Sequence, residues 1–167
     1  MSELILGLLH YSRVGQEAEQ KVISTQQMLK AVLIDLHALI VRYQVKIRIA
    51  KLPSIKANPV ALRQVFQHLL ENAIKFQRPG ASIEVQVSCQ QVDGFHQFCI
   101  EDNGIGIPKA YQEKIFLIFQ QLHQKNEYDG NGMGLALCKK IIEMHKGKIW
   151  LQSEPNAGTK FYFSLPA

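Results

Sequence analysis

The sequence has few cysteines, no long apolar run and no block of like charges. Its three cysteines, Cys89, Cys99 and Cys138, form an odd number without a CxxC pair, so we expect reduced thiols and no disulfide scaffold. No apolar run approaches the roughly 20 residues of a membrane-spanning helix. The apolar start lacks the basic leader and cleavage site of a signal peptide. The spacing of His, Cys and carboxylate residues does not suggest zinc. We expect a cytoplasmic chain without a membrane segment.

The positive charge is also scattered. Lys and Arg exceed Asp and Glu by 19 to 14, but the excess forms no cluster and is not interleaved with aromatic residues. This pattern favours a phosphate-bearing small molecule or a solvated surface, and it argues against nucleic acid as a partner. The 167 residues, of which 47% are hydrophobic, are enough for one domain with a full core.

Hydrophobic periodicity and turn signals predict an α+β fold: a two-layer α/β sandwich with helices on one face of a mixed, mostly antiparallel sheet. Asn58 at the N-cap and Pro59 at the first helical position start the clearest helix, and Gly147 is expected to cap the last one. The expected helices are 2–15, 24–43, 57–76, 111–119 and 132–147, and the expected strands are 45–50, 82–92, 95–102, 148–154 and 159–166. The polar segment 120–132 is long for a compact domain and is a candidate mobile lid.

The hairpin around Asp93-Gly94 orients one acidic residue toward the core. A two-residue turn places Val85 opposite Asp102 on the face that also carries Ile100, while Glu101 points the other way. Asp102 therefore lies at the rim of the core. A buried carboxylate needs donors, which an Arg, a backbone N–H or the exocyclic amino group of a bound base would each supply.

Three further features have more than one explanation. His68, Asn72 and Lys75 lie within about 60° of one another on a helix, which suits Mg²⁺ and a phosphate but also an ordinary solvated face. Gly104 and Gly106 allow a flat ligand to approach the backbone, but a plain loop explains them too. The glycines of "GNGMGLAL", residues 130–137, precede a helix N-terminus, which suits a phosphate chain. No βαβ unit surrounds them, which argues against a Rossmann fold.

In this order and spacing, the features resemble the ATP-binding domain of sensor histidine kinases, whose fold is shared with gyrase and a heat-shock chaperone. "HLLENAIKF" resembles the N box, "EDNGIGIP" the first glycine box, "KIFLIFQQLH" the F box and "DGNGMGLAL" the second glycine box, and "GTKFYFSLP" matches the closing strand. Residues 4–15 resemble the end of a kinase dimerisation hairpin of the phytochrome-like subgroup. The resemblance divides the chain into a helix end and linker, 1–19, and a catalytic domain, 20–167.

The resemblance assigns a role to each matching residue. Asn72 would bind Mg²⁺, Lys75 would contact a phosphate, and Asp102 would accept from the adenine amino group. Phe76 would lie by the adenine or ribose, and Thr159 would line the adenine end. The remaining cofactor-binding positions are glycine-box residues around the base and phosphates: Gly104, Gly106, Ile107, Gly130, Asn131, Gly132, Met133, Gly134 and Leu135.

The chain departs from the family pattern in three places. At the catalytic positions, His68 stands where these kinases usually carry Asn, and Gln121 stands where many carry an Arg near the γ-phosphate. The acceptor motif is absent, because neither His10 nor His37 has its sequence context. Gln adds no charge to stabilise a transition state.

The resemblance implies the nucleotide half of a two-component phosphorelay kinase. Its cofactors would be ATP and Mg²⁺, and it would transfer the γ-phosphoryl to a histidine outside this chain. The implied partners are ATP or ADP, a histidine-bearing dimerisation domain, a response regulator, and a second copy through residues 1–13. Two alternatives stay open: a degenerate module that only binds or senses nucleotide, and a serine-directed kinase or ATPase of the same superfamily.

Overall fold

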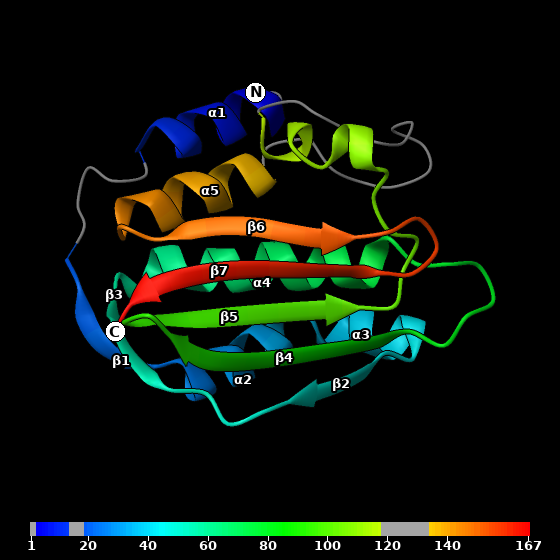
Figure 1. The fold of residues 1–167 in the computed structure, drawn as a ribbon, viewed down its shortest axis with the longest axis horizontal. Coiled ribbons are helices and arrows are strands. Elements are labelled where there is room, and N and C mark those ends of the chain that lie inside the picture. Colours follow the sequence, from blue (N-terminus) through cyan, green and yellow to red (C-terminus); the bar gives the residue numbers. More distant parts are fainter. Residues whose placement is uncertain (1–2, 14–18, 118–133) are drawn as a thin grey trace.

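The computed structural model describes residues 3–13, 19–117 and 134–167. A five-stranded sheet in the order β2-β4-β5-β7-β6 forms its centre (Figure 1). β2 pairs in parallel with β4, and the other neighbouring strands pair antiparallel. The five strands are β2 (Lys46–Ile49), β4 (Glu84–Val92), β5 (Phe95–Asp102), β6 (Lys148–Ser153) and β7 (Thr159–Pro166).

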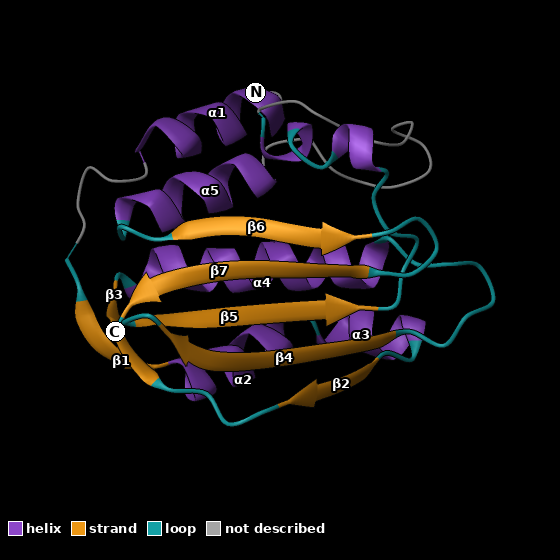
Figure 2. Ribbon diagram, in the orientation of Figure 1, coloured by secondary structure: helices purple, strands orange, loops and turns teal. Residues whose placement is uncertain are grey.

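A layer of helices covers one face of this sheet (Figure 2). The layer consists of α2 (Thr25–Asp35), α3 (His37–Tyr43), α4 (Pro59–Lys75) and α5 (Gly134–Met144). A small second sheet pairs β1 (Lys21–Ser24) with β3 (Ser54–Ala57) in antiparallel orientation. The predicted two-layer α+β fold with a mixed, mostly antiparallel sheet is therefore confirmed.

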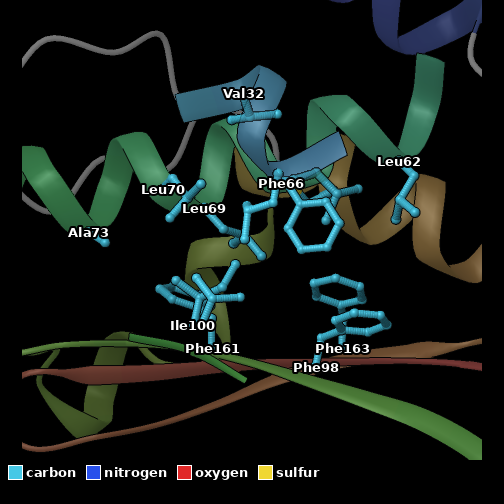
Figure 3. Packing of buried hydrophobic residues seen from close by; sticks show 14 of the residues in the cluster. Val32, Leu62, Phe66, Leu69, Leu70, Ala73, Phe98, Ile100, Phe161 and Phe163 are labelled. Atoms are coloured by element: carbon cyan, nitrogen blue, oxygen red, sulfur yellow. The ribbon is translucent and has the colours of Figure 1, made fainter. Parts of the chain in front are cut away.

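The long helix α4 is the centre of the core. It starts as predicted, because the Asn58 side chain accepts a hydrogen bond from the Ala61 N–H at 3.1 Å and Pro59 follows. Phe66 packs edge-on against Phe98 and Phe163, with ring centroids 5.7 and 5.4 Å away (Figure 3). Full burial of each such side chain stabilises the fold by about 1.5–3 kcal/mol. This packing fixes α4 relative to the middle of β5 and β7.

The central hairpin has the predicted register. Val85 pairs with Asp102 and Val87 with Ile100 across β4 and β5. Asp93 and Gly94 both have positive φ, as the two-residue turn of a hairpin requires. Cys89, Cys99 and Cys138 are free thiols, as expected.

Four predictions of local structure were wrong. The expected helix 24–43 is two helices, because Leu36 leaves helical geometry at φ −91° and ψ 5° between α2 and α3. The short strands β1 and β3 were missed. The expected helix 111–119 is replaced, in its described part, by two 3-10 turns, η1 (Lys109–Tyr111) and η2 (Lys114–Phe116).

The fourth error concerns the end of α5. Lys146, with φ 61°, takes the left-handed position predicted for Gly147, and the Gly147 N–H bonds the Ile142 carbonyl at 3.0 Å. Glycine is needed at 147 for a different reason. A Cβ there would lie 1.8 Å from the Ser164 carbonyl oxygen on β7.

The first helix, α1 (Glu3–Arg13), contacts α5. The Lys140 ammonium donates to the Tyr11 carbonyl at 2.6 Å and lies 4.4 Å from the centre of the Tyr11 ring. Ile5, Leu6, Leu8 and Leu9 on α1 are exposed. No helix in the described part of the chain is long and apolar enough to cross a membrane. The division at residue 19 and the pairing of two copies through residues 1–13 stay predictions.

Candidate nucleotide-binding site

The C-terminal half of α4 carries one wall of the candidate site. His68, Asn72 and Lys75 are each partly exposed on the flank of the helix, beside the face that packs on the sheet. The Lys75 ammonium lies 3.8 Å from the Glu71 carboxylate. Within the described ranges, the Asn72 side-chain amide has no hydrogen-bond partner. Its oxygen is therefore available to a ligand.

Asp102 ends β5 on the core side of the sheet, between Val85 on β4 and Thr159 on β7. Its Oδ1 accepts a hydrogen bond from the Gly104 N–H at 2.8 Å. Burial raises the pKa of this carboxyl to about 7, although the backbone N–H groups of Gly104 and Thr159 oppose the rise, and the nearby Glu101 adds to it. No Lys or Arg in the described part of the chain forms an ion pair with Asp102.

The loop after Asp102 is held against α4 at a point where no side chain fits. The Ile105 N–H donates to the Phe76 carbonyl at 3.1 Å, and a Cβ at Gly104 would lie 2.2 Å from that same oxygen. Gly106 has φ 72°, and a Cβ there would lie 1.9 Å from the Glu154 carbonyl oxygen. Both glycines thus allow backbone segments to meet, a role that the sequence alone did not indicate.

Ser153, the last residue of β6, connects this loop to the start of β7. Its Oγ accepts from the Ile107 N–H at 2.8 Å, donates to the Gly158 carbonyl at 2.8 Å and lies 2.9 Å from the Thr159 hydroxyl. Ile107 and Thr159 are both buried. Residues 102–107 and the β6–β7 connection therefore form one hydrogen-bonded unit next to the C-terminal end of α4.

The start of α5 forms the other wall. Gly134 is the first residue of α5 and Leu135 the second. The His68 ring faces this end, since a Cβ at Gly134 would lie 3.2 Å from its Nδ1. The His68 ring on α4 thus lies beside the N-terminus of α5, although more than sixty residues separate them in sequence.

The chain matches one protein family over most of its length. The family model described as histidine kinase-, DNA gyrase B- and HSP90-like ATPase matches residues 57–167. The chain belongs to this family. Every part of the site described above lies within the matched residues.

Three individual proteins show how similar the relatives are. Phytochrome-like protein Cph1 of Synechocystis sp. is 41% identical over 99% of this chain and 22% of its own length. Adaptive-response sensory kinase SasA of Prochlorococcus marinus is 40% identical over 70% of this chain and 31% of its own length. The crystal structure of full-length ShkA in complex with AMPPNP is 26% identical, with a TM-score of 0.84 over 98% of this chain and 35% of that one. The chain spans about a fifth to a third of these relatives.

Some of the predicted site residues lie in the described ranges, where the structure brings them together, and the others lie outside these ranges. The structure brings together the N-box end of α4, the first glycine box after β5 and the start of β7, through the contacts of Phe76, Gly104 and Ile107. It also places His68 against Gly134. The predicted residues that lie outside the described ranges are Gln121, Gly130, Asn131, Gly132 and Met133, and the candidate lid 120–132 lies there too.

Sequence reasoning missed three residues that hold the site together. Ser153 connects Ile107, Gly158 and Thr159. Gly158 has φ 83°, and a Cβ there would lie 2.0 Å from the Asp102 carbonyl oxygen. Gln112 donates to two backbone carbonyls of the unit. Only Gly158 carried a signal, as the glycine of the "PNAG" turn.

Proposed function

We propose that this chain is the Mg-ATP-binding catalytic domain of a sensor histidine kinase. In the complete protein it transfers the γ-phosphoryl of ATP to a histidine that lies outside this chain. The phosphoryl group then passes to a response regulator, in a cytoplasmic two-component phosphorelay. The names of the relatives support a kinase, and the solved ShkA complex with the ATP analogue AMPPNP supports ATP as the nucleotide.

The observation that carries this proposal is the environment of Asp102. The carboxyl is largely removed from water and is held by backbone N–H groups, with no Lys or Arg paired to it within the described residues. Backbone N–H groups of Gly104 and Thr159 meet part of its need for donors, and no cation within the described residues competes for the rest. The carboxyl keeps acceptor capacity for a further donor, which the exocyclic amino group of adenine supplies. Guanine presents a carbonyl at that position and would leave two acceptors facing each other.

The residues around the phosphate end fit a hydrated Mg²⁺ that arrives with its nucleotide. Asn72 offers one amide oxygen, and Mg²⁺ keeps most of its water and phosphate ligands in such sites. No cluster of three or more His, Cys, Asp or Glu side chains in the described part of the chain is arranged to hold a metal by itself. When bound, Mg²⁺ would neutralise charge on the phosphates.

The other side chains would position and neutralise the nucleotide. Lys75 would contact a phosphate, and its ion pair with Glu71 keeps the ammonium on the flank of α4. Phe76 at the C-cap of α4 and Thr159 at the start of β7 would line the base and ribose end. The N–H groups at the start of α5, from Gly134 and Leu135, would meet the phosphate chain together with Gly130, Asn131, Gly132 and Met133. Phosphoryl transfer depends chiefly on such positioning and charge neutralisation.

Radiolabelled ATP tests the proposal on two proteins. The full-length protein should incorporate label that is acid-labile and base-stable, as expected of phosphohistidine. The chain of 167 residues alone should incorporate none, because no histidine in it has the acceptor context. Full-length protein that binds ATP but never becomes labelled would contradict the kinase assignment.

One observation favours a second candidate, a degenerate module that binds nucleotide without transferring phosphate. His68 lies against the first residue of α5, at the expected phosphate end, where these kinases usually carry Asn. Nucleotide binding without any label in the full-length protein would support this candidate. Restored labelling in a His68→Asn variant would show that His68 is the cause.

A further inference from the structure

Gln112 forms an unusual pair of contacts between the η1 and η2 turns. Its Nε2 donates to the Ile107 carbonyl and to the Ser153 carbonyl, each at 2.9 Å. Both hydrogens of one amide nitrogen are thus used on two segments that are far apart in sequence. The side chain is partly buried. A carboxylate of the same shape could not make these contacts, since it has no hydrogen to donate.

The two carbonyls belong to the unit that surrounds Asp102. Ile107 ends the glycine loop, and its own N–H donates to the Ser153 Oγ at 2.8 Å. Thr159, which lies 2.9 Å from that Oγ, is the strand partner of Asp102. Gln112 therefore joins the loop that follows Asp102 to the strand that precedes Thr159. We call Gln112, Ile107 and Ser153 the glutamine clamp.

We propose that Gln112 is a positioning residue for the nucleotide base. The inference rests on the proposed function, because it assigns to the glutamine clamp the task of holding the base-reading loop. Gln112 does not contact the base itself. It fixes Ile107 against the end of β6, and the loop 103–107 keeps the Gly104 N–H on the Asp102 carboxylate. Without the hydrogen bonds of Gln112, one side of the loop 103–107 is no longer held. The Asp102 carboxylate, which accepts from the base, is then less well ordered.

A glutamine suits position 112 because its amide supplies two hydrogen-bond donors. The two backbone carbonyls lie in a partly buried region, where each accepts a hydrogen bond from Gln112. Glutamate in place of Gln112 would set negative charge against both oxygens, while methionine would only remove the donors. An effect that both variants share therefore reports the lost hydrogen bonds and does not depend on the charge of the replacement. Gln90 on β4 is exposed and offers the same chemical change away from the site.

The test compares Gln112→Met and Gln112→Glu with Gln90→Glu and the unaltered chain. Dissociation constants for Mg-ATP and Mg-GTP are measured at a temperature where all four proteins are folded. We expect both Gln112 variants to bind Mg-ATP about tenfold more weakly, or about 1.4 kcal/mol. Mg-GTP affinity should hardly change, so the ratio of ATP to GTP affinity should fall by the same factor. Gln90→Glu should match the unaltered chain.

The possible results are distinguishable. Equal weakening for both nucleotides, or a lower melting temperature with unchanged affinities, would show a merely structural role and overturn the inference alone. An unaltered chain that binds neither nucleotide would overturn the proposed function and the inference with it. Amide hydrogen exchange of the apo proteins gives an independent measure. The Ile107 N–H should exchange faster in both Gln112 variants, and unchanged exchange would contradict the clamp.

Discussion

Replacing Asp102 with asparagine separates a base-reading acid from one that holds the fold. The substitution keeps the shape of the side chain but removes its charge. Its amide can also turn a donor toward the adenine amino group. Loss of a charge-assisted hydrogen bond costs about 1.5–3 kcal/mol, which corresponds to roughly one to two decades in Mg-ATP affinity. Mg-GTP affinity should not fall, because guanine offers no donor to the carboxylate and the asparagine amide can donate to the guanine carbonyl.

Although Asp102→Asn should weaken Mg-ATP binding, it should not lower the stability of the apo protein. The folded chain keeps the Asp102 carboxyl protonated up to a pKa of about 7, whereas the unfolded chain releases this proton near the ordinary value of 3.8. The folded state therefore binds more protons between these values, and the free energy of unfolding falls as the pH rises through this window. The difference between the two pKa values corresponds to roughly 4 kcal/mol against folding above pH 7. An asparagine side chain does not titrate, so the Asp102→Asn apo protein should melt at least as high as the unaltered protein at about pH 8.

The same pKa predicts how affinity depends on pH. The ionised carboxylate accepts from the amino group more strongly than the protonated acid does, so Mg-ATP affinity should fall as the pH drops below about 7. The terminal phosphate of ATP also titrates in this range, and the Asp102→Asn variant is the matched control for that contribution. Calorimetry and thermal melting on one preparation measure both quantities. Unchanged ATP affinity with a clearly lowered apo melting temperature would show that Asp102 holds the fold and does not read the base.

Three further predictions follow from the packing. Gly104→Ala should destabilise the protein and weaken Mg-ATP binding, because its Cβ would lie 2.2 Å from a backbone oxygen. Gly80→Ala is the control, since its Cβ meets no atom within 4 Å and the substitution carries only the strain of a positive φ. Equal melting temperatures and equal Mg-ATP affinities for the two variants would contradict this. Phe66→Ala should lower the free energy of unfolding by about 3–5 kcal/mol in urea titrations, and a loss below about 1 kcal/mol would refute its central place in the core. Removing residues 1–13 should abolish self-association in sedimentation experiments or lower stability, since the exposed apolar stripe of α1 is expected to pack on a second copy or on the domain itself. If the intact and shortened chains are equally stable monomers, the stripe makes neither contact.

The parts of the fold that the sequence predicts well are those with strong local rules. The Asn58-Pro59 start of α4 and the Asp93-Gly94 turn leave the backbone little choice, and the turn alone sets the register that carries Asp102 to the core side. The break at Leu36 could not be predicted, because leucine is a strong helix former and gives no stop signal. The Leu36 side chain is buried in the core at this break.

The sequence indicated which kinds of residues form the candidate site, but not the contacts that hold them together. The core side of Asp102 and the stripe on α4 follow from periodicity, whereas the glycine boxes come from the resemblance to the kinase family and the roles of these residues stay predictions. The structure adds a reason for two of these glycines, because Gly104 and Gly106 make room for backbone carbonyls of Phe76 and Glu154. Such contacts join segments distant in sequence. Ser153 and Gln112 also join distant segments, mainly through hydrogen bonds to backbone atoms, and such bonds have no signature in the sequence.

Isothermal titration calorimetry of this chain tests the central claim most directly. Saturating Mg-ATP and Mg-ADP should each release or absorb heat with one site per chain, because both carry the adenine that Asp102 is proposed to read. Mg-GTP at the same concentrations should give little or no heat. The absence of heat with both adenine nucleotides would contradict the nucleotide site. Binding of Mg-GTP as tight as that of Mg-ATP would contradict the role of Asp102 in reading the base.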